Sequence, residues 1–333
     1  MKAIVYTEYG SPDVLQIKEI AKPVPKDNEI LIRVYATSLS VGEVWARNFK
    51  AISPSQFSMP FPFWFPARMF FGFTKPKVNI LGSEFSGVIE AIGKDVKKFT
   101  VGEPVFGYRG QNMGANAEYL CTPENGMVTT KPSTMTYEEA AVVPYGATTA
   151  LNLLRKANIQ RGQKVLINGA SGSIGSAAVQ LAKYYGAEVT GACSTPRVEF
   201  VKSLGADKVI DYTKEDFTKN SETYDLIFDI MNKSSFANCK SSLKQNGIYL
   251  LASFKMKQVF QMLWTSITGG KKVICALALE NPKDLVLIKE LVEAGKFKSI
   301  IDRRFSLEQT ADAHKYFESG NKAGCIVITL TNN

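Results

Sequence analysis

The stretch KVLINGASGSIGSAAVQLAKYYGAEVTGAC, residues 164–193, constrains the fold more than any other part of the chain. An apolar run at 164–168 leads into the turn GASGSIG, and a segment with Ile174 and Leu181 on one face ends at Gly186. A second apolar run follows at once. Strand, glycine-rich turn, helix and strand within about thirty residues predict a βαβ unit that binds the pyrophosphate of a dinucleotide.

The residues of this turn are small enough to let a phosphate approach the backbone. Ala170, Gly172 and Gly175 permit a tight turn and close packing of helix on strand, and the free N–H groups at the helix start would face an anion. An ordinary glycine turn that only opens a helix is the alternative interpretation. The cofactor-binding residues predicted in the turn are Ser171, Gly172, Ser173, Ile174 and Gly175.

The end of the second strand indicates which dinucleotide is bound. A fold that prefers the unphosphorylated ribose usually places Asp or Glu about 20 residues after the turn, whereas this strand ends Cys-Ser-Thr with no acid before Glu199. Thr195 and Pro196 look like an N-cap and a first helical residue. Arg197 then lies in a first helical turn, where the helix dipole disfavours a cation. A 2′-phosphate would resolve that conflict, so NADP(H) is the predicted cofactor; a solvated surface arginine is the alternative.

The rest of the chain is organised around this unit. Six apolar runs between 164 and 278, mostly separated by helical patterns, predict a parallel sheet covered by helices on both faces. Residues up to about 125 are rich in short strands and turns, and the tail adds two helices and two short strands. We therefore expect an α/β protein with a Rossmann doubly wound parallel sheet over 126–267 and a β-rich domain formed by 1–125 and 268–333.

Composition excludes several classes of protein. Hydrophobic residues at 45% and charged residues at 21% fit a soluble globular chain. The net charge of +9 is spread along the sequence without a basic helix or zinc-finger spacing, so nucleic acid is not an expected partner. Five widely spaced cysteines predict free thiols in a reducing compartment. With no secretory signal and no run of about 18–20 apolar residues, a cytoplasmic location is expected.

A metal site is not predicted. Zinc needs three or four Cys, His or carboxylate ligands, often with closely spaced cysteines. The first cysteine is Cys121, no CxxC is present, and the single histidine is His314, in an amphipathic stretch near the C-terminus. That pattern is typical of a surface or partly packed histidine.

Over nearly its whole length the chain resembles the medium-chain dehydrogenase/reductase superfamily, and within it the zinc-free quinone oxidoreductase branch, the zeta-crystallin-like proteins. The segments MKAIVYTEYGSPDVLQIKEI, LGSEFSGVIEAIGKDVKKFTVGEPVFG, AAVVPYGATTALNLL and SLGADKVIDYTKEDF are similar to the family in order and spacing. Zinc-dependent relatives carry Gly-His-Glu where this chain has Gly82-Ser83-Glu84. The resemblance implies a GroES-like fold for the β-rich domain and a homodimer formed through the nucleotide domain, with KKVICALA as the contact.

The resemblance also implies cofactor contacts outside the turn, near the nicotinamide, around the 2′-phosphate, in a loop beside the cofactor and at a strand end. In that order these residues are Thr149; Ser194, Arg197 and Tyr212; Met231 and Asn232; and Ser253 and Phe254. Asn232 stands where glycine is commoner in the family. Each residue has an alternative interpretation as an ordinary turn or core residue.

The stretch ATSLSVGEVWAR resembles the family segment that lines the substrate side. Ser40 replaces the usual Asn and could donate a hydrogen bond to a substrate carbonyl, and Trp45 could stack on a flat substrate. Glu43, in place of Asp, fits a helix-start or structural carboxylate better than an acid catalyst. The sequence identifies no general acid.

The resemblance implies zinc-independent hydride delivery from NADPH to a quinone or to the β-carbon of an α,β-unsaturated carbonyl. The substrate would be small, apolar and electrophilic. Two alternatives stay open. One is a zinc-free NADP-dependent alcohol or carbonyl dehydrogenase, and the other is an NADPH-binding protein with little catalysis that acts structurally or at membranes.

The aromatic stretch MPFPFWFPARMFFGF at 59–73 lies in a connection from about 48 to 79 that is longer than in the family. Its prolines argue against a membrane-spanning helix, and connections of this length without periodicity are usually functional or mobile. Three roles stay open for residues 57–73: a wall or lid of the substrate pocket, extra core or dimer packing, and an interfacial loop flanked by cations. Membrane contact is not the expectation.

Overall fold

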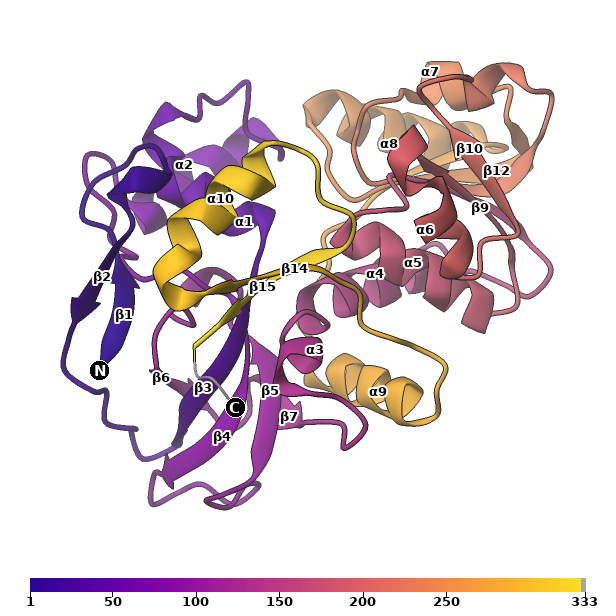
Figure 1. Ribbon diagram of the computed structural model, residues 1–333. Helices are drawn as coiled ribbons and strands as arrows, with labels where there is room; N and C mark the ends of the chain where they lie inside the picture. The colour runs from indigo at the N-terminus through magenta and orange to yellow at the C-terminus, as the bar shows by residue number, and fades with distance from the viewer. Residues whose placement is uncertain (331–333) are drawn as a thin grey trace. The chain divides into compact units, whose positions relative to one another are not determined.

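The computed structural model describes residues 1–330 and divides the chain into two compact units, each of which is built on its own β-sheet (Figure 1). The first unit consists of Met1–Pro54, Phe65–Tyr145 and the chain from Glu280 onward. The second unit consists of Ser55–Trp64 and Gly146–Leu279.

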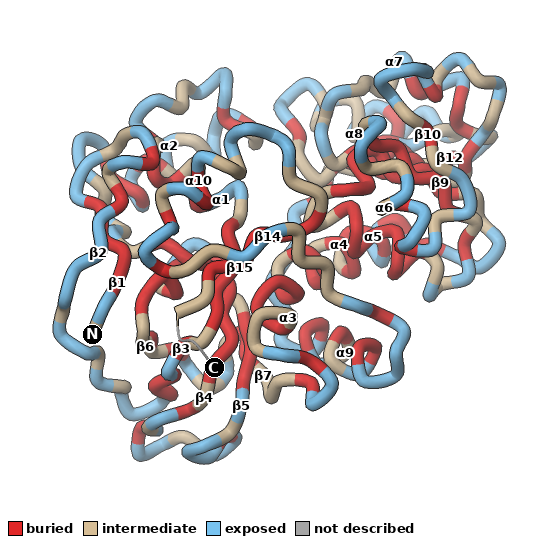
Figure 2. Tube along the Cα trace, viewed as in Figure 1, coloured by how far each residue is buried: buried red, intermediate tan, exposed pale blue. Residues whose placement is uncertain are grey.

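The second unit contains a six-stranded parallel sheet in the order β10-β9-β8-β11-β12-β13, which confirms the predicted Rossmann arrangement. Its strands are β8 (Lys164–Asn168), β9 (Glu188–Cys193), β10 (Lys208–Asp211), β11 (Tyr224–Asp229), β12 (Leu243–Leu251) and β13 (Lys272–Cys275). Its helices are α4 (Pro144–Lys156), α5 (Ser173–Tyr184), α6 (Val198–Ser203), α7 (Phe236–Cys239) and α8 (Met256–Thr268). The inner strands β8, β9 and β11 are buried along most of their length, whereas the edge strands β10 and β13 are not (Figure 2), as expected for a sheet covered on both faces.

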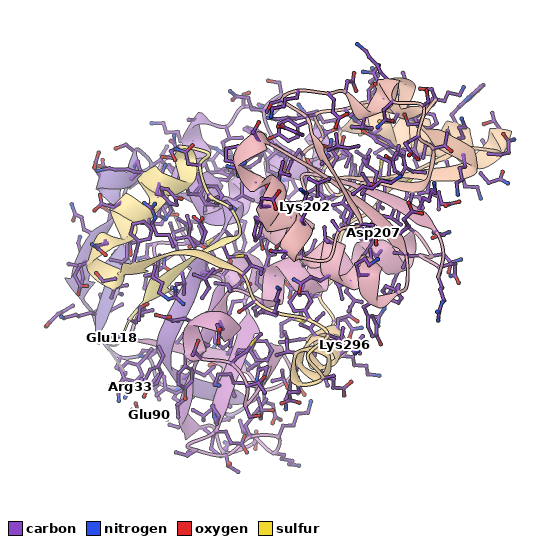
Figure 3. All side chains as sticks on the ribbon, turned by 45° about the vertical axis from the view of Figure 1, so that its right-hand side comes forward. Arg33, Glu90, Glu118, Lys202, Asp207 and Lys296 are labelled. Carbon is purple, nitrogen blue, oxygen red and sulfur yellow. The ribbon has the colours of Figure 1, made fainter. Side chains whose placement is uncertain are left out.

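The first unit contains a mostly antiparallel sheet in the order β14-β15-β3-β4-β5-β7, with β6 paired to β3, and a separate β1–β2 hairpin. Its strands are β1 (Lys2–Val5), β2 (Gln16–Glu19), β3 (Glu29–Leu39), β4 (Glu84–Ile92), β5 (Pro104–Tyr108), β6 (Tyr119–Pro123), β7 (Met127–Thr130), β14 (Ile301–Ser306) and β15 (Cys325–Thr329). Its other helices are α1 (Val41–Arg47), α3 (Tyr137–Ala141), α9 (Pro282–Glu293) and α10 (Thr310–Glu318). Ile32, Phe85 and Val105 are fully buried in its core, whereas Arg33 on β3 and Glu90 on β4 lie at the surface (Figure 3).

Both predicted domain boundaries move in the structure. Strand β7 pairs with β5, so the chain from 126 to Tyr145 belongs to the first unit and not to the nucleotide-binding unit. Strand β13 pairs with β12, so the chain from 268 to Leu279 belongs to the second unit. The sequence analysis placed the borders at 125/126 and 267/268, but strand pairing with distant residues decides membership.

The aromatic stretch contains a helix, α2 (Phe61–Phe71), which the sequence did not predict. Pro66 lies inside it and lacks the N–H of a helical hydrogen bond. Tertiary contacts stabilise its C-terminal end: the Tyr9 hydroxyl donates to the carbonyls of Phe71 at 2.7 Å and Gly72 at 2.8 Å. Lys77 Nζ donates to the carbonyl of Met69 at 3.0 Å. These contacts satisfy carbonyls that a helix end otherwise leaves without partners.

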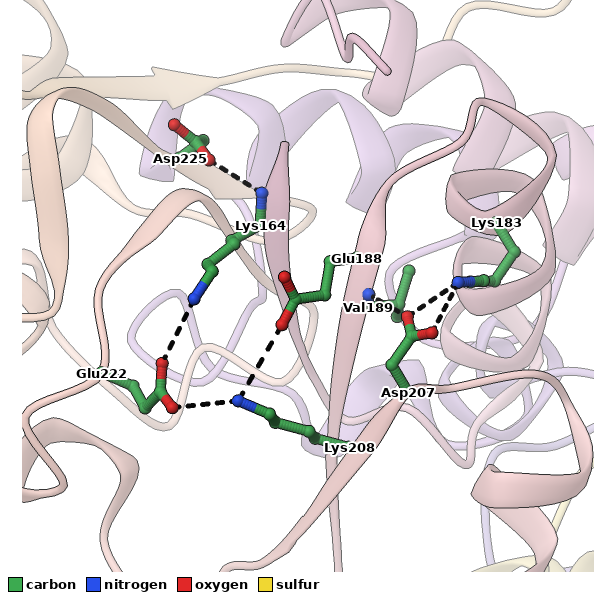
Figure 4. A network of polar contacts seen from close by, with 8 residues as sticks. All are labelled: Lys164, Lys183, Glu188, Val189, Asp207, Lys208, Glu222 and Asp225. Atoms are coloured by element: carbon green, nitrogen blue, oxygen red, sulfur yellow. Dashed lines mark hydrogen bonds and ion pairs between the residues drawn. The ribbon is translucent and has the colours of Figure 1, made fainter. Parts of the chain in front are cut away.

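A charged network joins the amino ends of strands in the second unit (Figure 4). Lys208 forms ion pairs with Glu222 at 3.0 Å and Glu188 at 3.9 Å. Asp207 accepts from the Val189 N–H and pairs with Lys183, both at 2.7–2.8 Å. These charged groups lie at the amino ends of the strands, whereas the predicted cofactor loops begin at the carboxyl ends. Their charges therefore have a structural explanation and do not require a ligand.

Candidate active site

The predicted phosphate-binding turn lies between β8 and α5, where the sequence placed it. Gly169 has a φ of +95°, and its N–H and that of Ala170 donate to the carbonyl of Ala192 at the end of β9. Gly172 is the N-cap of α5, and its carbonyl accepts from Ser176 at 2.8 Å. The first N–H groups of α5 are thus positioned at the carboxyl ends of β8 and β9, where a dinucleotide pyrophosphate binds in this type of fold.

Two glycines of the turn differ in the space around them. A Cβ on Gly175 would collide with the Gly169 carbonyl oxygen and lie 2.8 Å from the Cα of Ala170. A Cβ on Gly172 would meet nothing nearer than the Gly169 oxygen at 3.8 Å. Gly175 is therefore required for packing, while Gly172 leaves open space in which a ligand could approach the backbone. Gly169, whose left-handed φ the turn needs, was not among the predicted site residues.

Other predicted cofactor residues lie beside the turn. The start of α4 packs against it, since a Cβ on Gly146 would lie 2.8 Å from the Ser173 carbonyl oxygen. Thr149 is one helical turn further along the same face of α4. The Met231 side chain packs over Gly169, where its Cγ would lie 2.8 Å from an added Cβ. Met231, which follows the turn in the sequence, thus packs over it, and Thr149 lies on α4, which precedes the turn and packs against it through Gly146.

Asn232 adopts a φ of +50°, a left-handed conformation that favours glycine. Asparagine tolerates this conformation better than most residues. The loop that begins here is held by Asp229, fully buried at the end of β11, which accepts from Asn168 Nδ2 at 3.0 Å and the Tyr249 hydroxyl at 2.7 Å. One carboxylate therefore ties together the carboxyl ends of β8, β11 and β12.

Ser194, Arg197 and Tyr212 come together at the carboxyl end of β9. Arg197 Nη1 donates to Ser194 Oγ at 3.2 Å, and the Tyr212 N–H donates to the Cys193 carbonyl at 3.0 Å. The helical turn over Thr195–Arg197 has Ser194 as its N-cap, so the prediction of Thr195 at that position is wrong by one residue. Serine is at least as favourable as threonine at an N-cap position.

Asp211, which the sequence analysis missed, lies in the same group of residues. It accepts hydrogen bonds from the hydroxyls of Thr195 and Thr213, both at 2.6 Å, and these bonds lower the pKa of its carboxyl. An ionised carboxylate weakens the binding of a nearby 2′-phosphate by repulsion, whereas the positive charge of Arg197 strengthens it. The preference for NADPH therefore depends on the balance between these two charges.

The end of β12 holds the last predicted pair, Ser253 and Phe254. Ser253 Oγ donates to the Ser58 carbonyl at 2.7 Å, and Lys255 Nζ donates to the Ser55 carbonyl. These bonds fasten the start of the aromatic segment onto the second unit. Phe254 is buried in the core with Leu166 and Tyr249. Its side chain therefore has the core role that was the alternative interpretation.

In the first unit, Ser40 is the N-cap of α1, and its Oγ lies 3.5 Å from Ser83 Oγ. Glu43, fully buried, accepts from the Ser40 N–H at 3.0 Å. This is the helix-start role expected for Glu43. Trp45, on the same helix, is partly buried. Ser83 was quoted from the sequence but not predicted as a site residue, although its place in the Gly-Ser-Glu stretch was the available signal.

A second buried carboxyl, Glu84, lies behind these hydroxyls. It accepts from the Ser38 hydroxyl and from the Tyr145 N–H, the latter at 2.7 Å. The rings of Tyr145 and Tyr108 are 5.6 Å apart. Burial raises the pKa of Glu43 to about 8 and of Glu84 to about 7. Glu43 therefore favours the neutral form at pH 7, whereas Glu84 titrates close to that pH, and both carboxyls carry less negative charge there than exposed carboxylates do.

The raised pKa of Glu43 predicts a pH-dependent stability. The group favours folding fully below its unfolded value of 4.5, and this contribution is lost as pH rises towards about 8. Between pH 6.5 and 8 the free energy of unfolding should fall by up to about 1.4 kcal/mol per pH unit from this carboxyl. In Glu43→Gln the fall should become shallower in urea titrations, whereas Glu90→Gln, at an exposed carboxyl of β4, should retain the wild-type slope. Equal slopes in all three proteins would contradict the assignment.

Residues for a zinc site are not brought together. Within residues 1–330, no group of three His, Cys, Asp or Glu side chains lies close enough to hold a metal ion. His314 is fully buried and not on the surface; its Nδ1 lies 2.8 Å from Arg47 Nη1, and burial lowers its pKa to about 3. The described residues do not fit zinc, and no chemical step is assigned to one.

Two family models match the chain. The description "Alcohol dehydrogenase GroES-like domain" matches residues 26–151, and "Zinc-binding dehydrogenase" matches residues 204–328. The first covers most of the strand-rich unit and the second covers much of the nucleotide unit and the tail. The zinc named in the second description has no ligand set among the described residues.

Relatives and a solved structure agree with these matches. The chain is 31% identical to the 2-methylene-furan-3-one reductase of Solanum lycopersicum, an alignment that covers 98% of this chain and 79% of the relative. It is 29% identical to the chloroplastic NADPH-dependent alkenal/one oxidoreductase of Arabidopsis thaliana, with the same coverage. The quinone oxidoreductase of Coxiella burnetii superposes with a TM-score of 0.84 at 28% identity, over 99% of both chains.

Proposed function

Because the chain belongs to the quinone oxidoreductase branch of the medium-chain dehydrogenase/reductase superfamily, we propose that it reduces quinones or α,β-unsaturated carbonyls with NADPH and without zinc. It is an oxidoreductase that uses a nicotinamide cofactor. NADPH, when bound, supplies the hydride. The protein's own contribution is to hold the cofactor and to stabilise the substrate oxygen.

The observation that carries this proposal is the hydroxyl pair of Ser40 and Ser83, with two buried carboxyls behind it. Hydroxyls aimed at a carbonyl or quinone oxygen can stabilise the negative charge that develops there as the hydride arrives. Oxidation of an alcohol would instead need a group that accepts its proton. Glu43, whose raised pKa favours the neutral form at pH 7, is a poor acceptor, and the Glu84 oxygens accept from Ser38 and from the Tyr145 N–H instead of from the serine pair, which favours the reductase over the alcohol dehydrogenase alternative.

The test is NADPH consumption with an o-quinone, a p-quinone, an alkenal and an alkenone, followed by product identification. We expect turnover of at least one class, and a loss in kcat of about a hundredfold in Ser40→Ala or Ser83→Ala. Ser319→Ala, at an exposed serine beyond α10, should behave as wild type. Inertness towards all four substrates would exclude the proposal, and oxidation of alcohols with NADP+ would favour the dehydrogenase.

Specificity for NADPH is proposed on the basis of Arg197, Ser194 and Tyr212. Loss of a charge-assisted hydrogen bond of about 1.5–3 kcal/mol predicts that Arg197→Ala weakens NADPH binding by about 10–100-fold and leaves NADH binding unchanged. Asp211→Asn should tighten NADPH binding, because a like charge is removed. Lys219→Ala removes an exposed cation of the same unit that pairs with Asp216 and not with Asp211, and it serves as the control. Equal losses for the two cofactors in Arg197→Ala, measured by fluorescence titration, would contradict a 2′-phosphate contact.

We also propose a homodimer formed by α8. Val273 N–H on edge strand β13 donates to Thr265 Oγ1 at 3.0 Å, and Cys275 N–H points to Met262 Sδ at 3.5 Å. Because these N–H groups of the KKVICALA strand face side chains of α8, we place the proposed dimer contact on α8 instead of on the strand. Phe260, Trp264 and Ile267 are 63%, 70% and 84% exposed on α8, and such patches favour association.

A cytoplasmic location is proposed as well. The five cysteines are free thiols in the structure, as a reducing compartment favours. No helix within residues 1–330 is long and apolar enough to cross a bilayer.

A further inference from the structure

Helix α2 is apolar on both of its sides, and its single charged residue, Arg68, faces the protein interior instead of solvent. Its inward side is formed by Trp64, Ala67, Arg68 and Phe71, of which Arg68 and Phe71 are buried. Arg68, only 7% exposed, is the one charged residue of the helix. Surface helices normally point charges to solvent and apolar residues to the core. The inward position of Arg68 therefore requires a specific explanation.

The outward side of α2 consists only of Phe, Pro and Met residues. Phe61, Phe65 and Met69 are 63%, 54% and 52% exposed. Phe63 and Phe70 are also exposed, as is Phe73 just beyond the helix. Scattered apolar residues at a surface are ordinary, but a contiguous set on one helix marks an interaction site. The feature needs a partner that accepts aromatic side chains.

Contacts around Arg68 hold the helix in this orientation. Its Nη2 donates to the Phe73 carbonyl at 2.7 Å, and the guanidinium lies 5.7–5.9 Å from the ring centroids of Tyr9, Phe49 and Phe73. The rings of Phe49 and Phe71 are 5.2 Å apart. Cation–π contacts of a desolvated arginine are among the stronger ones. Rotation of the helix to bury its outward side would break all of these contacts.

Charge around the helix is one-sided. The forty residues from 44 to 83 contain five Lys or Arg and no Asp or Glu. Lys50, Lys75 and Lys77 are exposed near the ends of the aromatic stretch. Exposed aromatic side chains flanked by cations, in a segment that itself contains no acid, complement an anionic surface that has an apolar interior.

We propose that α2 docks on the surface of a membrane that contains anionic lipids. The helix lies flat, because its length of about 16 Å is too short to cross a bilayer. Phe61, Phe65 and Met69 enter the boundary between headgroups and acyl chains, and the lysines contact lipid phosphates. A second copy fits less well, since a twofold contact places each surface against itself and brings the same lysines together. This role departs from the expectation that membranes are not partners, and it does not depend on which substrate the enzyme reduces.

The test is co-sedimentation of the full chain with vesicles of phosphatidylcholine alone and of phosphatidylcholine mixed with phosphatidylserine. We expect binding to the mixed vesicles that weakens as salt is added. Phe65→Ser/Met69→Ser should lower the partition coefficient by at least about tenfold through lost apolar burial. Lys50→Gln/Lys75→Gln should lower it by roughly tenfold through lost attraction. Val24→Ser/Val101→Ser removes exposed apolar groups elsewhere in the first unit, 84% and 59% exposed, and should not change it.

Two results would overturn this inference: wild-type protein that fails to sediment with the mixed vesicles, or α2 variants that bind as wild type does. Sedimentation velocity without lipid adds a third, because an α2 variant that turns a dimer into a monomer would show that α2 contacts a second copy. NADPH affinity and unfolding midpoints should stay at wild-type values in all α2 variants, which excludes misfolding as the cause. Loss of vesicle binding with intact quinone or enone reduction distinguishes this proposal from the proposed function.

Discussion

Replacing Gly175 by alanine is expected to weaken NADPH binding by at least about a hundredfold and to destabilise the second unit by about 2–3 kcal/mol. The new Cβ would meet the Gly169 carbonyl oxygen and the Ala170 Cα, both of which are backbone atoms. Backbone atoms of a turn tied to β9 cannot move aside as a flexible side chain would. The start of α5 must therefore shift away from β8, and the N–H groups that would face the pyrophosphate shift with it. Isothermal titration with NADPH and urea unfolding measure the two effects.

Gly172→Ala is the matched control for this change. Gly172 has a φ of −81°, which any residue adopts, and an added Cβ would have open space. Its free energy of unfolding should stay within about 0.5 kcal/mol of wild type. NADPH binding should still weaken, because the methyl group occupies space through which a phosphate approaches the helix start. If Gly175→Ala binds NADPH as wild type does, the turn is not the cofactor site; if only Gly172→Ala does so, the phosphate lies elsewhere on the turn.

Replacing Arg47 by alanine is expected to destabilise the first unit by about 3–5 kcal/mol. Arg47 is 2% exposed; its Nε donates to the Gly10 carbonyl at 3.2 Å and its Nη1 lies 2.8 Å from His314 Nδ1. Nη2 forms an ion pair with Glu318. Alanine would leave a cavity and remove the partners of buried polar groups on α10 and near the N-terminus. Urea unfolding in the absence of NADPH measures the loss.

Glu318→Gln tests how much of the stability lost in Arg47→Ala comes from the ion pair and how much comes from the buried contacts of Arg47. Glu318 is partly exposed, and an ion pair with one solvated partner contributes up to about 1 kcal/mol. A small effect of Glu318→Gln beside a large effect of Arg47→Ala would show that Arg47 acts through its buried hydrogen bonds and its volume. Comparable effects of the two variants would contradict that explanation.

The nucleotide-binding unit was predictable because its signals are local. Strand, turn and helix between 164 and 193 follow from apolar periodicity and from glycines with distinct backbone roles. Ser194, Arg197 and Tyr212 lie together in the structure, since the carboxyl ends of adjacent parallel strands meet at one edge, and their contact with the cofactor stays a prediction. Asp211 escaped notice because it lies on β10, outside the segment in which an acid was sought.

The first unit was less predictable because its chemistry depends on residues far apart in the sequence. Glu43 and Glu84 are 41 positions apart, yet burial in one sheet raises the pKa of both. Helix α2 escaped prediction because Pro66 argues against a helix and apolar residues lie on both of its sides. Tyr9 and Lys77 supply the carbonyl partners that its own sequence does not provide.

The sequence by itself determined the parallel Rossmann sheet, the glycine turn and the use of a nicotinamide cofactor, because each rests on short-range periodicity and backbone geometry. Only the tertiary structure decided which residues of the first unit are neutral, which side of α2 meets solvent, and where the two units divide. Those properties depend on burial and on partners from distant segments. The free energy of an ionised carboxyl, or of an exposed phenylalanine, is set by its surroundings and not by its neighbours in the chain.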